Sequence, residues 1–390
     1  MDQFKPVNPP SRVGIIGGGQ LGRMMTMEAK RLGYHVTVFS NEPNSPAGQM
    51  ADSEMLYSTE EQLFRTVCEA KLNAVTIDNE QVPAEVLMQL REHGLNLHPS
   101  PDAVFLMQDK TRQKAWLASL GVPCPKQIFT GTVSEFLKKN VAPRYPVCMK
   151  SAQGGYDGKG VWILSDRDDA LETLLRLPKG LQVVVEEYVN ISKEYSLVFC
   201  KDIFGTVKYY PVIENQHRGG ILEYSVCPAQ ICEKTRRIIE VCGAAVAQKL
   251  NTLGVCCIEF MEDTNGILFA NEMCVRPHNS AHLTIEGAVT GQFEQHIRSI
   301  MGLPVGSTRV FRPAVMVNIL GTADAAAITC DGLGQVLQEE SVYLHLYGKT
   351  GMKENRKIGH ITVLDETETL AQQKAERAIN SLTIREASGE

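Results

Sequence analysis

At residues 150–160 the chain reads KSAQGGYDGKG, in which four of the last seven residues are glycine and the lysines are Lys150 and Lys159. Strands are predicted directly before and after this run. The backbone amides of such a glycine-rich loop can close over phosphate oxygens, with Lys150 as a fixed cation and Lys159 moving with the loop. A purely structural hairpin would not need so many glycines, because each one costs entropy on folding. We therefore favour a phosphate-binding loop, which is not a Walker loop because Gly160 stands where that motif requires Ser or Thr.

Two acidic residues, Glu259 and Glu272, flank a predicted hairpin further along the chain. Asn265-Gly266 between them is a strong signal for a two-residue turn. With that turn the register sets Glu259 opposite Glu272, about 5 Å apart, where like charges destabilise a sheet. A hard cation such as Mg²⁺ between the carboxylates would explain the pair. The alternatives are a slipped register or a pair at a frayed sheet edge.

A glycine turn, Gly17-x-Gly19-x-x-Gly22, lies near the N-terminus between a predicted strand at 13–16 and a predicted helix at 20–32. Glycines in this place let a backbone approach an anion at the start of a helix. The motif alone is weak evidence, since it fits a dinucleotide, another phosphate, or a turn that only lets strand and helix pack.

The order of the predicted elements divides the chain into three segments with different patterns of secondary structure. The first 100 residues alternate strands and helices, which is typical of a mostly parallel sheet covered on both faces. A small α+β segment follows, and then long strands interrupted by one amphipathic helix. Predicted strands are 13–16, 36–39, 74–77, 145–150, 161–164, 183–189, 195–200, 207–214, 255–261, 267–272, 314–320, 342–346 and 360–364. Predicted helices are 20–32, 60–70, 84–93, 110–120, 168–175 and 233–250.

Two polar clusters remain. The run Arg276-Pro277-His278-Asn279-Ser280-x-His282 is dense in polar groups that need partners from the protein or a ligand. For either histidine alone, an ordinary core residue is the favoured interpretation. Near the C-terminus Lys349 and Arg356-Lys357 could hold a phosphate, although for this cluster alone a solvated loop is the favoured interpretation.

Composition excludes several classes of protein. The 39 basic and 45 acidic residues give a net charge of −6, which argues against a general nucleic-acid binder. No apolar run approaches the roughly 18 residues of a membrane span, and the N-terminus lacks a targeting pattern, so we expect a cytoplasmic protein with no membrane partner. The 11 cysteines contain no C-x-x-C motif, and we expect them to be reduced and buried.

Taken together, the motifs resemble the ATP-grasp superfamily and, within it, the family of N5-carboxyaminoimidazole ribonucleotide synthetases. The resemblance covers roughly residues 13–363 and rests on the order and spacing of GIIGGGQLGRMM, QDKTRQK, GGYDGKG, EEYVNISKEYS, ENQHRGGIL, NEMCVRPHNSAH and YGKTGMKENRKIGHIT. It implies an α/β and α+β chain: an ATP-grasp fold preceded by a Rossmann-like pre-ATP-grasp domain. The implied domains are 1–108, a small lid at 109–190, and a large domain with a C-terminal lobe at 191–390.

The resemblance also implies an ATP site and a metal site. It assigns two Mg²⁺ ions to Glu259 and Glu272, in agreement with the hairpin register. The implied ATP-binding residues, from the phosphate loop, the adenine hinge and the ribose side, are Lys110, Lys150, Gly155, Tyr156, Gly158, Gly160, Val161, Glu186, Glu187, Tyr188, Val189, Glu194, His217 and Asn271.

A second implied site holds 5-aminoimidazole ribonucleotide. Its residues are Gly19, Gln20, Leu21, Glu80, Tyr156, Asp157, His278 and Asn279, with Lys349, Arg356 and Lys357 on the phosphate. The implied catalytic residues are Asp157, Lys159 and Arg276, and Asp157 is the candidate for handling the proton of the amine. The chain departs from the usual family residues at Asp78, Val161, Cys274, Val275, Ala281 and Leu283.

The implied reaction is carboxylation of the exocyclic amine with ATP and bicarbonate through carboxyphosphate, in purine biosynthesis, by a homodimer. Another ATP-grasp ligase, such as a formate-dependent ribonucleotide transformylase or a biotin carboxylase-like enzyme, would keep the ATP site and change the acceptor. An NAD-dependent dehydrogenase would rest on the first glycine turn alone and leave the acidic pair unexplained. A nucleotide-binding module without catalysis would not need both acids and both lysines.

Overall fold

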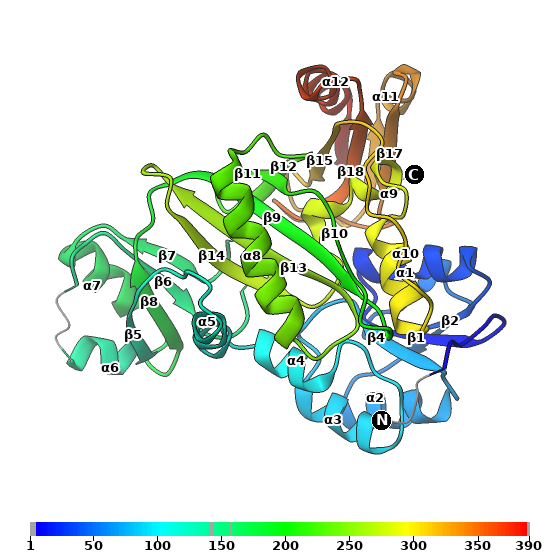
Figure 1. The fold of residues 1–390 in the computed structure, drawn as a ribbon, viewed down its shortest axis with the longest axis horizontal. Coiled ribbons are helices and arrows are strands. Elements are labelled where there is room, and N and C mark those ends of the chain that lie inside the picture. The colour runs from blue at the N-terminus through cyan, green and yellow to red at the C-terminus, as the bar shows by residue number, and fades with distance from the viewer. Residues whose placement is uncertain (1–4, 140–142, 156–157, 388–390) are drawn as a thin grey trace.

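The computed structural model describes residues 5–139, 143–155 and 158–387. Its elements form an N-terminal unit, a small middle unit and a large C-terminal unit (Figure 1).

The N-terminal unit is a parallel sheet with helices on both faces, as predicted. Its strands lie in the order β3-β2-β1-β4. Successive residues of β1 pack on opposite faces of the sheet. Ile15 packs with α1, and Ile16 packs with α2 and α3. The short β3 was not predicted, because its half-exposed residues SEML show no apolar pattern. The strands are β1 (Arg12–Ile16), β2 (His35–Ser40), β3 (Ser53–Leu56) and β4 (Ala74–Ile77); the helices are α1 (Gln20–Arg31), η1 (Gly48–Met50), α2 (Glu60–Glu69), α3 (Ala84–Glu92) and α4 (Pro101–Met107).

The middle unit is an antiparallel sheet in the order β5-β8-β6-β7 with helices on one face. Val147 and Met149 of β6 pack with those helices. The alternate residues Cys148 and Lys150 face a cleft on the other side. This unit comprises α5 (Lys110–Ser119), β5 (Gln127–Thr132), α6 (Val133–Lys138), β6 (Val147–Ser151), β7 (Val161–Leu164), α7 (Arg167–Arg176) and β8 (Gln182–Glu187).

A long antiparallel sheet, in the order β14-β13-β9-β11-β12-β15-β18-β17, forms the large unit, and β10 pairs with β9. Helix α8 packs on one end of it and α12 on the other. The strands are β9 (Ile191–Lys201), β10 (Val207–Tyr209), β11 (Ile213–Arg218), β12 (Ile221–Cys227), β13 (Gly254–Asp263), β14 (Leu268–Cys274), β15 (Ala314–Leu320), β17 (Val342–Leu346) and β18 (Lys357–Leu364), with a separate pair β16 (Ile328–Asp331) and β19 (Thr383–Glu386). The helices are α8 (Glu233–Lys249), η2 (Asn279–Ala281), α9 (Thr284–Gly287), α10 (Gln292–Ile300), α11 (Leu333–Gln338) and α12 (Glu368–Ser381).

One strand prediction was wrong. The expected continuous strand at 207–214 is divided into β10 and β11, which pair with different parts of β9. Pro211 lies in the interruption and has no backbone N–H to donate to a neighbouring strand.

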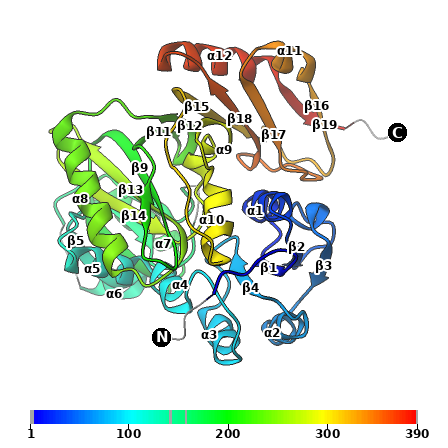
Figure 2. The same ribbon diagram turned by 45° about the vertical axis from the view of Figure 1, so that its right-hand side comes forward.

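Helix α10 joins the large unit to the N-terminal unit, and Figure 2 shows it beside α1. Phe293, Ile297 and Ile300 of α10 share a buried cluster with Met24 and Met25 of α1. The two units are therefore held by a common apolar core, which fixes the cleft between them.

Buried His296 also connects the large unit to the N-terminal unit. Its Nδ1 accepts the N–H of Val255 at 3.1 Å, so the ring hydrogen is on Nε2, which lies 2.8 Å from Oγ1 of Thr76. Burial lowers the pKa of His296 to about 3. The neutral ring therefore links β13 to β4.

We expect this histidine to make the fold sensitive to acid. Between its unfolded pKa of about 6.5 and its folded pKa, the unfolded chain binds a proton that the folded chain does not, so stability falls as pH falls. The slope is about 1.4 kcal/mol per pH unit for one group. Urea unfolding from pH 6 to pH 4 should show a shallower loss for His296→Gln than for the parent chain. Equal slopes would contradict the assignment.

None of the helices in the described ranges is long and apolar enough to cross a membrane.

Candidate active site

A cleft of about 1460 Å³ lies where the three units meet. Residues of the glycine turn, the middle unit and the acidic pair all line it. Most of the predicted site residues are among them: Gly19, Gln20, Leu21, Glu80, Lys110, Lys150, Gly155, Gly158, Lys159, Val161, Glu186, Glu187, Tyr188, Val189, Glu194, His217, Glu259, Asn271, Glu272, Arg276, His278, Asn279 and Lys357.

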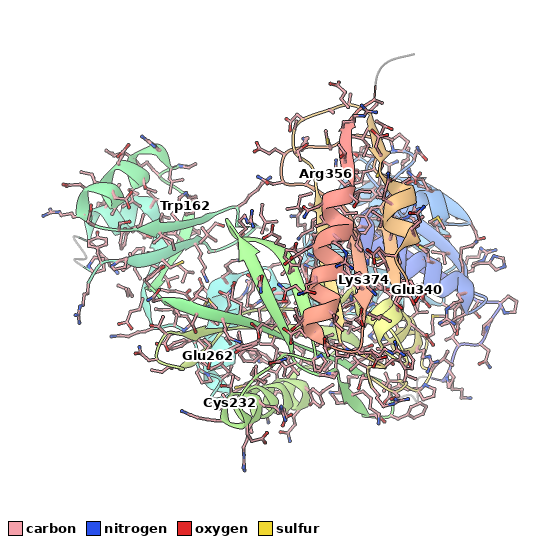
Figure 3. All side chains as sticks on the ribbon, turned by 90° about the horizontal axis from the view of Figure 1, so that it is seen from above. Trp162, Cys232, Glu262, Glu340, Arg356 and Lys374 are labelled. Atoms are coloured by element: carbon pink, nitrogen blue, oxygen red, sulfur yellow. The ribbon has the colours of Figure 1, made fainter. Side chains whose placement is uncertain are left out.

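A few predicted residues lie elsewhere. Gly160 is outside the lining, and a Cβ there would come within 2.5 Å of Oγ of Ser151, so this loop position has no room for a side chain. Lys349 donates from Nζ to the carbonyl of Lys357 at 2.5 Å, and Arg356 is exposed on the loop before β18 (Figure 3). Tyr156 and Asp157 lie outside the described residues.

The acidic pair is opposed in the sheet, as predicted, although the predicted turn is wrong. Glu259 pairs with Glu272, but Phe260 pairs with Ala270, and the register shifts between them. Asp263 N–H donates to the Ile267 carbonyl, so the turn holds three residues and not two. A bulge at Asn271 compensates for the extra turn residue.

The bulge has a consequence for the cleft. Two consecutive residues of a regular strand point to opposite faces, but a bulge allows both to face the same way. Asn271 and Glu272 are consecutive and both line the cleft, while Ala270 before them packs in the core. Three oxygen-bearing side chains, those of Glu259, Asn271 and Glu272, therefore meet the same space.

Cations surround this oxygen cluster. Nζ of Lys150 donates to Oδ1 of Asn271 at 2.7 Å, and Nζ of Lys110 lies 3.3 Å from Oε2 of Glu272. Nε2 of His278 lies 2.8 Å from Oε1 of Glu259. Burial opposes the charge of Glu259, but the hydrogen bond and charge of His278, together with the charges of His217 and Lys357, lower the pKa of the carboxyl to about 2.

The donors fit Mg²⁺ held jointly with a nucleotide. Hard carboxylate and amide oxygens suit this ion, which is usually held by one or two carboxylates together with substrate phosphates. Within the described ranges no group of three or more His, Cys, Asp or Glu side chains could hold a metal ion. Glu259 and Glu272 therefore provide part of a coordination shell that phosphate oxygens would complete.

A buried ion-pair triad lies beside the cluster. Glu186 is 1% exposed, and its two carboxylate oxygens lie 2.8 Å from Nζ of Lys114 and 3.2 Å from Nζ of Lys150. Burial opposes its charge, but the lysines lower its pKa. Both carboxylate oxygens of Glu186 are therefore paired with lysines, and one of them positions Lys150. Lys114 was not predicted, although it follows Lys110 by one helical turn and so shares its face.

Another ion pair, between Glu194 and His217, lines the cleft. Nδ1 of His217 is 2.8 Å from Oε2 of Glu194. Burial opposes the charge of His217, but the hydrogen bond and charge of Glu194 raise its pKa. Tyr188, in the connection from β8 to β9, is 42% exposed and lines the same part of the site.

Asp78 is the second site residue that the sequence did not predict. Its buried carboxylate accepts the N–H of Gly19 at 2.6 Å, and a Cβ on Gly17 would lie 1.8 Å from its Oδ1. Burial raises the pKa of Asp78 to about 6. The carboxylate of Asp78 therefore occupies the position at the glycine turn where a bound anion would lie. The close approach of this carboxylate explains why glycines are needed there, and no bound dinucleotide is required to explain them. The sequence did contain a signal for Asp78. This residue directly follows β4, and the glycine turn follows β1, so the parallel pairing of the two strands brings both to the same edge of the sheet.

Polar side chains converge at the end of β14. Nε of Arg276 donates to Oε2 of Glu80 at 2.7 Å, and the N–H of Val275 donates to Oε1 of Glu80 at 3.3 Å. Both polar side-chain atoms of Asn279 are buried with no hydrogen-bond partner among the described residues. A bound polar ligand would satisfy them.

Known protein families match the chain in three consecutive segments. Residues 11–108 match the ribonucleotide synthetase preATP-grasp domain, 115–293 the ATP-grasp domain, and 314–374 the phosphoribosylaminoimidazole carboxylase C-terminal domain.

Relatives match along almost the whole length. The N5-carboxyaminoimidazole ribonucleotide synthase of Bacillus subtilis is 32% identical over 363 residues, covering 93% of both chains. The crystal structure of the corresponding synthetase from Thermotoga maritima is 36% identical, with a TM-score of 0.85 over 97% of this chain and 100% of that one. A structure of the Aspergillus clavatus synthase in complex with ADP and 5-aminoimidazole ribonucleotide is 27% identical, with a TM-score of 0.82 over 95% of this chain and 98% of that one.

Proposed function

The chain belongs to the family of N5-carboxyaminoimidazole ribonucleotide synthases, which are ATP-dependent ligases of the ATP-grasp superfamily, and we propose that it carboxylates the exocyclic amine of 5-aminoimidazole ribonucleotide in purine biosynthesis. One observation carries the proposal. A single cleft joins the lysines and acids suited to ATP with the polar cluster at the end of β14.

ATP occupies the part of the cleft near the middle unit. Lys110 and Lys150 act on its phosphates, and the glycine-rich loop covers them. Glu259, Glu272 and Asn271 would hold Mg²⁺, which would supply positive charge to the phosphates when bound. Phosphoryl transfer needs mainly positioning and neutralisation of charge, and Lys150 is positioned for both by Glu186 and Asn271.

Bicarbonate and the ribonucleotide meet at the polar cluster. A bicarbonate oxygen attacks the γ-phosphorus, ADP leaves, and carboxyphosphate releases CO₂ and phosphate. The exocyclic nitrogen then attacks the CO₂ carbon and loses a proton, for which Asp157 is the candidate acceptor. Arg276 and Asn279 orient the ribonucleotide, and the closed loop excludes water that would hydrolyse carboxyphosphate.

We further propose domain boundaries near 108 and 190, and a cytoplasmic homodimer. The separate sheets of the first two units support the boundaries. Light scattering of the purified protein at several concentrations tests the dimer, which a constant monomer mass would contradict.

The deciding experiment is an ADP-release assay. With ATP, Mg²⁺ and bicarbonate present, adding 5-aminoimidazole ribonucleotide should increase ADP release at least tenfold and yield its N-carboxylated product. Formate in place of bicarbonate, or biotin in place of the ribonucleotide, should not increase ADP release. If the rate of ADP release does not change with the ribonucleotide, or increases with formate or biotin, another ATP-grasp ligase would be favoured.

A further inference from the structure

Two cysteines oppose each other on the hairpin that carries the acidic pair. Cys257 of β13 pairs with Cys274 of β14. They lie two residues from Glu259 and Glu272, and side chains two apart share a face of the sheet. Both thiols belong to one buried cluster and lie close enough to interact. A pair of thiols therefore adjoins the pair of carboxylates.

The register of the strands suits a covalent bond between these sulfurs. Directly opposed residues of antiparallel strands have Cα atoms about 4.5–5.5 Å apart. Disulfides span Cα distances of about 4.4–6.8 Å. The bulge begins only after Glu259, so the pairing from Cys257 to Glu259 is unbroken. A disulfide needs no change of register.

The two thiols differ in their access to solvent. Cys274 lines the cleft, whereas Cys257 is fully buried behind it. The expectation that the cysteines are buried was wrong for Cys232, which is exposed at the start of α8 (Figure 3). It was also wrong for four cysteines that are only partly buried, Cys68, Cys124, Cys148 and Cys330. All 11 cysteines are free. A small oxidant entering the cleft would reach Cys274 first.

We propose that Cys257 and Cys274 form a reversible disulfide that inactivates the cleft when hydrogen peroxide is present. The sulfur of Cys274 attacks one peroxide oxygen, the O–O bond breaks, and a sulfenic acid and one water form. The sulfur of Cys257 then attacks the sulfur of Cys274, the S–O bond breaks, and a second water leaves. Together the two thiols lose two protons and two electrons, and a dithiol reductant restores them.

The bond disturbs substrate-binding groups. Cys274 Sγ donates to the carbonyl of Arg276 at 3.5 Å, and a disulfide has no hydrogen for this contact. Drawing Cys274 toward β13 also shifts Val275 and Arg276, which hold Glu80. A displacement of about 1 Å in a catalytic site can cost 100-fold in rate.

The test uses diamide, an azo compound that takes two hydrogens from a dithiol and leaves a disulfide and a hydrazine. We expect non-reducing peptide mapping of treated parent protein to recover a peptide joining Cys257 to Cys274. ADP release should fall at least tenfold and return with dithiothreitol. Cys257→Ala should keep its activity under diamide, and the matched control Cys232→Ser should remain as sensitive as the parent.

Two results would overturn the proposal. One is that both thiols of the treated parent stay free to alkylation. The other is that Cys257→Ala, or Cys257→Ser if the alanine variant folds poorly, loses activity as the parent does. The measurement of ADP release rests on the proposed function, but the peptide map does not. A failed function would therefore appear as an inactive reduced enzyme that still forms the cross-link.

Discussion

Glutamine in place of Glu259 should slow ADP release by about 100- to 1,000-fold, the loss seen when one preorganised electrostatic group is removed from an active site. Glutamine keeps the shape of the side chain but removes the anion that Mg²⁺ requires in our proposal. The loss should therefore appear in kcat and persist at saturating ATP. The fold should survive, because His278 can release its proton and leave no unpaired buried charge.

Glu262→Gln is the matched control for this experiment. Glu262 lies on the same strand but outside the cleft lining, where it accepts hydrogen bonds from Tyr195 at 2.8 Å and Thr235 at 3.1 Å. Its substitution should change ADP release less than threefold. Glu259→Gln with normal turnover and unchanged circular dichroism would refute the metal assignment.

The acidic pair also shows how far the sequence could lead. The prediction that Glu259 faces Glu272 was correct, but it relied on a two-residue turn that the chain does not form. The three-residue turn shifts the register by one, and the bulge at Asn271 shifts it back. A bulge has no residue signature as distinct as Asn-Gly, so the two compensating irregularities could not be predicted.

The fold was more predictable than the partners of individual side chains. The alternating strands and helices of the first 100 residues follow from apolar periodicity, which acts locally. Asp78 and Lys114 depend on contacts with distant segments: Asp78 with the glycine turn, Lys114 with Glu186. Glu186 was assigned from its motif to the adenine hinge, and only the folded chain shows that its carboxylate is enclosed by two lysines.

That enclosure leads to the largest stability effect we expect. Glu186→Gln should destabilise the protein by about 3–5 kcal/mol, because removing one partner of a buried pair leaves charge uncompensated. Lys114 and Lys150 would keep their mutual repulsion with no carboxylate between them. Urea unfolding at neutral pH measures the loss.

Glu187→Gln provides the comparison at the adjacent position of β8. The Glu187 side chain is 57% exposed and lies 3.4 Å from Lys126, so its loss should cost at most about 0.5 kcal/mol. Lys114→Met combined with Glu186→Gln should recover part of the stability, since one buried charge is then removed along with its counterion. If Glu186→Gln unfolds at the same urea concentration as Glu187→Gln, the buried triad does not stabilise the fold, and the stabilising role given to Glu186 is wrong.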